Sequence, residues 1–255
     1  MNWLDIAAFL ALGFVAGTYG TLVGIGGGLI VVPILIFNHY PDRIAAGTSM
    51  VVVLGNALSG SSSFLRQRRV HVRAAIVFAL AGIPGALFGA LIDQHVPQRL
   101  FNLLFALLLA TVGVRILTSR VADAGETAGA GGTDVPFSWA MTAAVGFFAG
   151  LVASIFGVGG GLIYVPTMVY LLGFLTHVAT ATSTFAIAIT AVFATSAHAY
   201  FHDIRWDTAI AVACGAVAGG QVGAQIAARA RSRQLLQFFS LAVFIAAAWL
   251  VYRSW

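Results

Sequence analysis

Residues 13–33 read GFVAGTYGTLVGIGGGLIVVP, and residues 146–166, which begin 133 positions later, read GFFAGLVASIFGVGGGLIYVP. Twelve of the 21 aligned positions are identical. After one inserted residue, a shift of 134 pairs Thr48-Ser49 with Thr182-Ser183. Chance does not produce this agreement, so the sequence predicts an internal duplication into two homologous units.

Composition indicates the environment of these units. Of the 255 residues, 60% are hydrophobic and 8% are charged, and the mean hydropathy is +0.96. A soluble domain has roughly 45–50% apolar and 25% charged residues. A transmembrane helix needs about 20 mostly apolar residues and must satisfy its backbone hydrogen bonds internally. The sequence therefore predicts an all-α polytopic protein of the inner membrane, surrounded by lipid and without a soluble catalytic domain.

Polar residues divide the chain into eight hydrophobic blocks, four in each half. The blocks are 3–38, 43–65, 72–93, 98–118, 137–174, 177–199, 207–228 and 234–252. The polar, glycine-rich stretch between the halves has the composition of a linker. We therefore expect a first transmembrane repeat over 1–118, a linker over 119–136 and a second transmembrane repeat over 137–255.

The first block of each half is too long for one straight span. At about 1.5 Å per residue, the 36 residues of block 3–38 would reach roughly 54 Å, against a hydrocarbon core of about 30 Å. Clustered glycines cost roughly 1 kcal/mol each within a helix and adopt positive φ readily. We therefore expect Gly24–Gly28 and Gly157–Gly161 to interrupt these helices, with half-helices starting near Leu29 and Leu162.

Two membrane topologies fit such interruptions. If each first block crosses the membrane once, eight of the 13 basic residues share one side with both termini: Arg66, Arg68, Arg69, Arg73, Arg115, Arg120, Arg205 and Arg253. If the blocks instead fold back as hairpins, the two repeats are inverted relative to each other. The positive-inside rule places Arg66–Arg73 in the cytoplasm.

The helix interruptions are also the strongest candidates for a binding site. A half-helix begins with unpaired N–H groups at the positive end of its dipole, and glycine lets an anion approach the backbone closely. Irregular backbone at membrane depth is tolerated where it lines a cavity or is buried in protein. Hydroxyl and amide groups in the following block of each half supply further donors. The expected substrate-binding residues are Gly26, Gly27, Gly28, Thr48, Ser49, Asn56, Gly159, Gly160, Gly161, Thr182, Ser183 and Thr190.

Structural roles compete with this interpretation. Serine and threonine in membrane helices commonly hydrogen-bond to backbone, so these hydroxyl groups could join helices instead of binding substrate. His198, near the end of its block, fits a packing or interface role. Four pairs of glycines with small-xxx-small spacing are interpreted as helix-packing positions, namely Gly13/Gly17, Gly85/Gly89, Gly146/Gly150 and Gly219/Gly223.

Charged and reactive residues limit the chemistry. All eight acidic residues fall at or near block ends or in loops, so no buried carboxylate relay is expected. This favours net anion movement, or coupling through protonation of the substrate itself. Basic residues at block ends are explained by topology and headgroup contacts, so nucleic-acid binding is not expected. The sequence has one cysteine, Cys214, and no H-E-x-x-H motif, and it predicts neither an enzyme nor a cofactor or metal site.

The duplicated glycine pattern resembles the sulfite exporter TauE/SafE family of membrane permeases, a group that includes 4-toluene sulfonate uptake permeases. The residues that carry the resemblance are Gly13, Gly17, Gly24, Gly26, Gly27, Gly28 and Pro33, their counterparts Gly146, Gly150, Gly157, Gly159, Gly160, Gly161 and Pro166, and the pairs Thr48-Ser49 and Thr182-Ser183. It implies transport of sulfite, thiosulfate, a sulfonate or a related carboxylate anion. Arg205-Trp206-Asp207 also resembles a family motif, from which its counterpart His71-Val72-Arg73 departs. An anion channel and a non-transporting scaffold or assembly factor are the alternatives.

Overall fold

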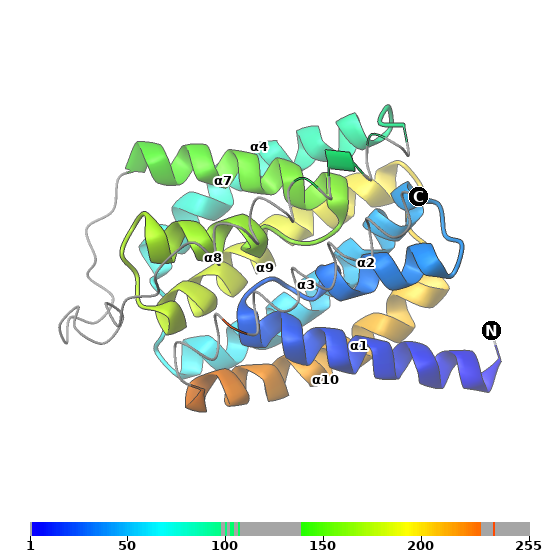
Figure 1. The fold of residues 1–255 in the computed structure, drawn as a ribbon, viewed down its shortest axis with the longest axis horizontal. Coiled ribbons are helices and arrows are strands. Elements are labelled where there is room, and N and C mark those ends of the chain that lie inside the picture. The colour runs from blue at the N-terminus through cyan, green and yellow to red at the C-terminus, as the bar shows by residue number, and fades with distance from the viewer. Residues whose placement is uncertain are drawn as a thin grey trace.

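The computed structural model describes residues 2–97 and 139–230, together with residues 100, 103, 104, 107 and 237 (Figure 1). The predicted blocks 98–118 and 234–252 lie almost wholly outside the described residues. The predicted linker 119–136 lies entirely outside them, as do Arg115, Arg120 and Arg253.

Eight helices make up the described part of the chain. They are α1 (Trp3–Val23), α2 (Gly28–Phe37), α3 (Asp42–Arg66), α4 (Val72–Asp93), α7 (Trp139–Phe156), α8 (Gly161–Tyr170), α9 (Thr176–Tyr200) and α10 (Trp206–Arg229). Six of them are long and apolar enough to cross a membrane, and α2 and α8 are short. The block limits agree with the helix limits to within a residue or two for α3, α4, α9 and α10, and the two long blocks each contain a long helix and a short one.

The short helices fold back beside the long helices that precede them. Gly27, at the start of α2, lies 2.8 Å from the Ala16 carbonyl oxygen when measured from an ideal Cβ position, so the chain reverses along α1. At the far end of the hairpin, the Tyr40 hydroxyl lies 2.8 Å from the Thr208 hydroxyl at the start of α10. Figure 1 shows α2 returning toward the end of the bundle where the N-terminus lies.

The contacts at glycines show the relative directions of the long helices. The contacts of α1 with α10 advance together, from Gly13 with Val212 to Gly17 with Ala216, so these helices are parallel. The same holds for α4 and α7, where Gly85 contacts Phe147. Such close backbone approach requires small residues, which confirms the packing role predicted for the four glycine pairs.

Each helix of the first half, α1–α4, runs in the direction opposite to that of its counterpart in the second half, α7–α10. Helix α3 is parallel to α10, because its Ser59 and Ser63 bond to Val217 and Gln221 in turn, and α4 returns antiparallel to α3 after a short turn. Since α1 is parallel to α10 and α7 is parallel to α4, α1 and α7 are antiparallel. This is the hairpin topology. The single-crossing topology is wrong, because Arg205 lies beside Thr48, at the opposite end of α3 from Arg66.

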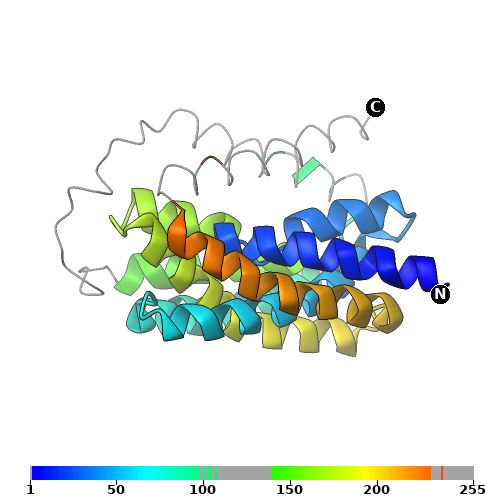
Figure 2. The same ribbon diagram turned by 90° about the horizontal axis from the view of Figure 1, so that it is seen from below.

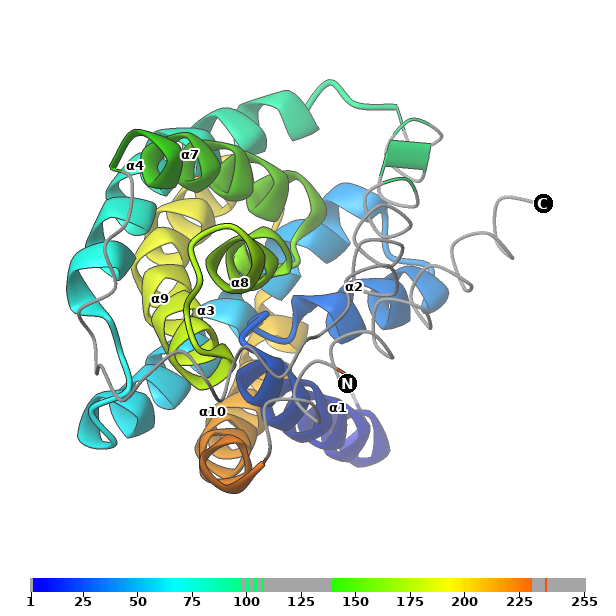
Figure 3. The ribbon, with the colours of Figure 1, turned by 60° about the vertical axis from the view of Figure 1, so that its left-hand side comes forward.

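Helices α3 and α9 form the centre of the bundle. They pack on each other, with the α1–α10 pair on one side and the α4–α7 pair on the other (Figures 2 and 3). Helix α2 packs on α3, and α8 packs on α9. Both central helices are polar for membrane helices, so the polar side chains of the described residues are concentrated inside the bundle.

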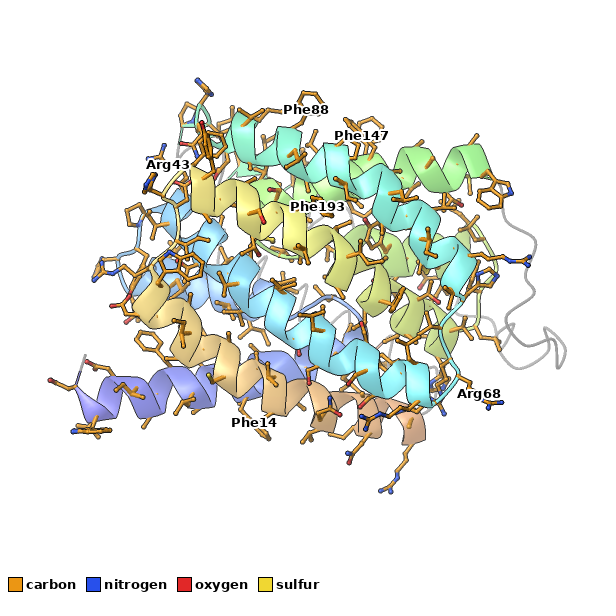
Figure 4. All side chains as sticks on the ribbon, turned by 180° about the vertical axis from the view of Figure 1, so that it is seen from behind. Phe14, Arg43, Arg68, Phe88, Phe147 and Phe193 are labelled. Carbon is orange, nitrogen blue, oxygen red and sulfur yellow. The ribbon has the colours of Figure 1, made fainter. Side chains whose placement is uncertain are left out.

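The outside of the bundle is apolar. Large hydrophobic side chains such as Phe14, Leu80, Phe88 and Phe148 are exposed on α1, α4 and α7, and Figure 4 shows Phe14 and Phe88 on opposite outer faces. Trp3, Trp139 and Trp206 are exposed at helix starts, where aromatic rings sit at the membrane–water interface. An exterior of this kind is stable in lipid and not in water, so the chain is a multi-pass membrane protein.

Candidate functional site

The two predicted helix interruptions are present. Helix α1 ends at Gly24, which has φ +81°, and Gly26 and Gly27 follow with φ +95° and +88° before α2 begins. In the second break, Gly157 and Gly159 have positive φ. Only glycine adopts this backbone without steric cost, so the glycine clusters determine where the long helices stop.

The second break differs from the first at one position. Gly160, the residue before α8, has φ −66°, whereas its counterpart Gly27 is left-handed. Positive φ therefore does not explain the glycine at position 160. A side chain is excluded there for another reason, because a Cβ would lie 2.6 Å from the Tyr164 ring.

The two breaks contact each other at the centre of the fold. A Cβ on Gly28 would overlap the carbonyl oxygen of Gly157, and a Cβ on Gly161 would overlap the carbonyl oxygen of Gly24. The relation is reciprocal, as expected for two equivalent segments around an approximate two-fold axis. The two half-helix N-termini therefore start side by side, although they come from opposite halves of the chain.

The two predicted serines join these breaks to the central helices. The Ser49 hydroxyl on α3 donates to the Gly157 carbonyl oxygen at 2.7 Å, and the Ser183 hydroxyl on α9 donates to the Gly24 carbonyl oxygen at 2.8 Å. Both serines are fully buried. Each hydroxyl proton is used within the protein, so these side chains position the break carbonyls.

The two predicted threonines lie beside the starts of other helices. The Thr48 hydroxyl oxygen accepts the Arg205 backbone N–H at 3.0 Å, and the Thr182 hydroxyl oxygen accepts the His71 backbone N–H at 2.9 Å. His71 and Arg205 precede α4 and α10, so each threonine satisfies an N–H that the helix itself leaves unpaired. His71 differs from Arg205 in its side chain, but its backbone N–H makes the equivalent hydrogen bond.

Backbone donors remain available at the breaks. Within the described ranges, no hydrogen bond occupies the N–H groups of Gly28 and Leu29 at the start of α2, or those of Gly161 and Leu162 at the start of α8. These groups are buried. Buried N–H groups in native proteins are nearly always paired, so a cluster of unpaired ones marks a place for a hydrogen-bond acceptor.

Asn56 adds a side-chain donor to the first break. Its amide oxygen accepts the Thr21 hydroxyl at 2.9 Å, whereas its amide nitrogen is fully buried and has no partner among the described residues. That nitrogen lies 3.7 Å from where a Cβ on Gly27 would stand. Asn56 therefore presents an NH₂ group at the first break.

A small pocket lies beside the second break, with room for about one water molecule. It is lined by the predicted residues Gly159, Gly160 and Thr190 and by small or apolar residues of α3, α4, α7 and α9. The Thr190 hydroxyl donates back to the Ala186 carbonyl oxygen of its own helix at 3.2 Å, and so does not present its proton to the pocket. Gly26 contacts Val53 and Ile187, which line the pocket from α3 and α9.

A polar seam runs from Asn56 along the α3–α10 interface. Ser59 donates to the Val217 carbonyl oxygen at 2.6 Å, and the Gln221 amide donates to the Ser59 carbonyl oxygen at 2.7 Å. About two turns further along α10, the guanidinium group of Arg69 donates to the Ala228 carbonyl oxygen at 3.1 Å. We call this the α3–α10 seam. The spacing of its serines along α3 is visible in the sequence, but their partners on α10 are not.

Three acidic residues at helix ends are buried. Asp42, Asp93 and Asp203 are 8%, 4% and 1% exposed, and His198, which is fully buried, lies among them. As the sequence indicates, these acidic residues lie at helix ends or in a loop and not at mid-membrane positions, but they are not solvated there. The reason is geometric: a residue at the end of a hydrophobic block is not solvated if a loop and two other helix ends close over it.

A membrane-embedded bundle with two discontinuous helices that meet at its centre is an architecture typical of secondary transporters. The sequence profile of the family described as sulfite exporter TauE/SafE matches residues 9–250. The chain therefore belongs to this family and is a membrane transporter, which confirms the resemblance drawn from the glycine pattern. The family is a class of transporters and not of enzymes.

Curated relatives agree with this class at full length. The chain is 31% identical to a probable membrane transporter protein of Xylella fastidiosa over 96% of this chain and 92% of the relative. It is 26% identical to the probable membrane transporter protein YunE of Bacillus subtilis over 98% and 99% of the two chains. No solved structure matches the chain.

Proposed function

We propose that the protein transports a small sulfur-containing or carboxylate anion, such as sulfite, thiosulfate or a sulfonate, and binds it where the two glycine breaks meet. The single observation that carries this proposal is the pair of half-helix N-termini, which leave buried N–H groups unpaired at one place. Hydrogen bonds from backbone N–H groups and the positive ends of two helix dipoles favour a negative charge.

The proposed site assigns different tasks to the residues predicted from sequence. Backbone groups of Gly26, Gly27 and Gly28, and of Gly159, Gly160 and Gly161, surround the anion, and Asn56 adds its amide. Ser49 and Ser183 hold the break carbonyls away from the anion, Thr48 and Thr182 hold the starts of α10 and α4, and Thr190 lines the approach from the pocket. The site contains no arginine among the described residues, so we expect modest affinity, micromolar or weaker.

A transporter fits these features better than the two alternatives. An anion channel needs a continuous pore, whereas the contacts between Gly28 and Gly157 and between Gly161 and Gly24 close the centre of the described bundle. A scaffold or assembly factor needs no pair of opposed breaks with unpaired donors. A transporter that exposes the breaks alternately to the two sides uses both features.

We also propose a membrane orientation. Among the described residues, Arg66, Arg68, Arg69, Arg73 and Arg229 lie at one end of the bundle, and Arg43 and Arg205 lie at the other. Figure 4 shows Arg43 and Arg68 at opposite ends. The positive-inside rule then places the larger group in the cytoplasm. In a Cys214→Ala background, a cysteine at His202 should react with an impermeant thiol reagent in intact cells, and a cysteine at Gln67 should not; the reverse result overturns the orientation.

The proposed activity can be tested in proteoliposomes that contain the purified protein. Wild type should move at least one of radiolabelled sulfite, thiosulfate, a sulfonate and acetate, and Gly27→Val should abolish this flux. Gly173→Val is the matched control, because Gly173 also has positive φ but nothing lies within 4 Å of its Cβ position. Absence of flux for all four anions in wild type, or equal flux in Gly27→Val, would contradict the proposal.

A further inference from the structure

A second group of buried polar side chains lies away from the breaks, at the end of the bundle that the proposed orientation places outside the cell. Asp93 is the last residue of α4, His198 lies in the last turn of α9, and Asp203 lies in the loop before α10. One nitrogen or oxygen atom from each of the three residues lies within 4.8 Å of the other two.

The contacts of His198 indicate which atoms of this group carry a hydrogen. Its Nε2 lies 3.0 Å from the Ser154 carbonyl oxygen, which can only accept, and 3.2 Å from the Ser154 hydroxyl, which can donate or accept; a hydrogen on Nε2 satisfies both contacts. In a neutral ring, Nδ1 then has a lone pair and no hydrogen. This Nδ1 faces Oδ2 of Asp203 at 3.6 Å. A lone pair and a carboxylate oxygen repel each other, so a proton on one of the two groups stabilises the arrangement.

Asp93 gives a second, independent indication. Its Oδ2 is buried and has no hydrogen-bond partner among the described residues, and the same is true of His198 Nδ1. A buried carboxylate without a partner carries a large desolvation cost. Both residues belong to the same group, so a proton bound there would lower the cost for both.

The charged and polar side chains around this group come from α3, from the residue after α4 and from α7. Helix α3 contributes Asp42 and Arg43, whose guanidinium group lies 3.2 Å from Oδ1 of Asp203. Gln94, directly after α4, donates its amide to Oδ2 of Asp203, and α7 contributes Ser154. Among the described residues, Arg43 is the cation that contacts this group, so its two carboxylates carry more negative charge than Arg43 neutralises until a proton binds.

We propose that Asp93, His198 and Asp203 together bind one exchangeable proton, and that this proton is the coupling ion of the transporter. Proton binding rests on the geometry of these residues alone, whereas its coupling to transport rests on the proposed function. No bond other than that to the proton forms or breaks: the proton enters from the outer aqueous side and adds to the shared acceptors.

The contacts of His198 connect this site to the breaks. Ser154, which His198 bonds, lies one turn before Gly157, whose carbonyl oxygen is held by Ser49. On α9, Thr190, Ala194 and His198 follow at four-residue spacing and so share one face. Thr190 and Ala194 line the pocket beside the second break. A change of charge on His198 therefore acts on the helix that ends at the second break and on the loop that starts α10.

Proton binding can be measured without any substrate. When the detergent-solubilised protein is moved from about pH 9 to about pH 6, a soluble indicator dye reports proton uptake across the range in which a perturbed histidine or carboxylate titrates. His198→Gln should lose one proton per chain relative to wild type. Asp93→Asn should shift the midpoint of uptake to lower pH, because it removes a buried negative charge. Asp207→Asn, which changes an exposed carboxylate, should leave uptake unchanged.

The outcomes separate the possibilities. Equal uptake curves for wild type and Asp93→Asn would overturn the shared site, even if His198→Gln failed to fold. Zn²⁺ that raises the thermal stability of wild type, but not that of His198→Gln, without competing with protons would assign the group to a metal and also overturn the proposal.

Coupling is tested in proteoliposomes that contain a transported anion. An imposed proton gradient should accelerate wild-type flux, whereas flux in Asp93→Asn should not respond to the gradient. A gradient response that survives in Asp93→Asn would overturn coupling through this site. If wild type moves none of the four anions, the proposed function fails, while the uptake measurement still decides the proton site.

Discussion

The α3–α10 seam and its counterpart between α9 and α4 both start beside the glycine breaks. The first ends at a positively charged side chain, and the second ends at negatively charged side chains. From Asn56 the first seam continues through serine and glutamine to the guanidinium group of Arg69. From Thr190 the second continues through Ala194 to His198 and the carboxylates of Asp93 and Asp203. We call the second one the α9–α4 seam. The repeat shift of 134 pairs Arg69 with Asp203.

This difference shows which contacts of the two halves of the chain are equivalent. At the centre, the contacts are reciprocal: Ser49 and Ser183 hold opposite breaks, and Thr48 and Thr182 hold opposite helix starts. Toward the ends, the side chains differ in polarity and in sign of charge. In the proposed transporter, a symmetric centre would let one anion site face either side, whereas asymmetric ends give the two sides different chemistry.

The largest effects are expected where the two halves contact each other directly. Gly28→Ala and Gly161→Ala should each abolish flux and lower the thermal stability in detergent by similar amounts, because the new Cβ overlaps a carbonyl oxygen of the other break. Gly55→Ala is the control, since a Cβ there overlaps no backbone atom and its nearest neighbour is the Val217 side chain, at 3.3 Å. Tolerance of either substitution would show that the breaks can separate and that their contact is not required.

A smaller, one-sided effect is expected in the α3–α10 seam. Gln221→Leu removes the bonds to the Ser59 carbonyl oxygen and the Ser63 hydroxyl and leaves these groups unpaired, so it should lower the free energy of unfolding by about 1–3 kcal/mol. Gln225, one turn later and exposed, is the matched position for Gln225→Leu. Denaturation of the detergent-solubilised variants measures both, and equal values would indicate that the seam is only a packed surface.

The smallest effects should be equal in the two halves. Thr48→Val and Thr182→Val each remove the acceptor for one backbone N–H, which is worth about 0.5–1.5 kcal/mol. Thr195→Val is a useful control, because the Thr195 hydroxyl is buried without a partner in the described part of the chain. That variant should be neutral or slightly more stable. Unequal losses for Thr48→Val and Thr182→Val would break the symmetry of the central contacts.

Much of the fold could be predicted from the sequence, because hydrophobic length and glycine clusters act locally. Block 72–93 coincides with α4, and the interruptions fall at the predicted glycines. The direction of the half-helices could not be predicted, because the hydropathy of a segment is the same whether it continues across the membrane or folds back. It depends on the left-handed conformations of Gly24 and Gly27 and on the contact of Gly27 with α1.

The helix breaks were predictable in position, but the contacts of the hydroxyl groups beside them were not. The spacing of Thr48-Ser49 and Thr182-Ser183 indicated paired polar positions, but each side chain bonds to the other half of the chain, and a sequence does not name that partner. The buried acids show the same limit more strongly. Asp93 and Asp203 are 110 positions apart, and each looks like a solvated helix end until the helices are assembled.

The most direct test of the central claim is anion binding to wild type, Asn56→Asp and Asn38→Asp, measured with radiolabelled sulfite and thiosulfate on the purified protein. Asn56→Asp replaces the buried NH₂ donor at the first break with a group that repels anions, whereas Asn38→Asp makes the same chemical change on an exposed side chain. Loss of a hydrogen bond to a charged ligand is worth about 1.5–3 kcal/mol, or roughly 10- to 150-fold in affinity. The account predicts at least this loss in Asn56→Asp and wild-type affinity in Asn38→Asp. Wild-type affinity in Asn56→Asp would contradict an anion site at the glycine breaks.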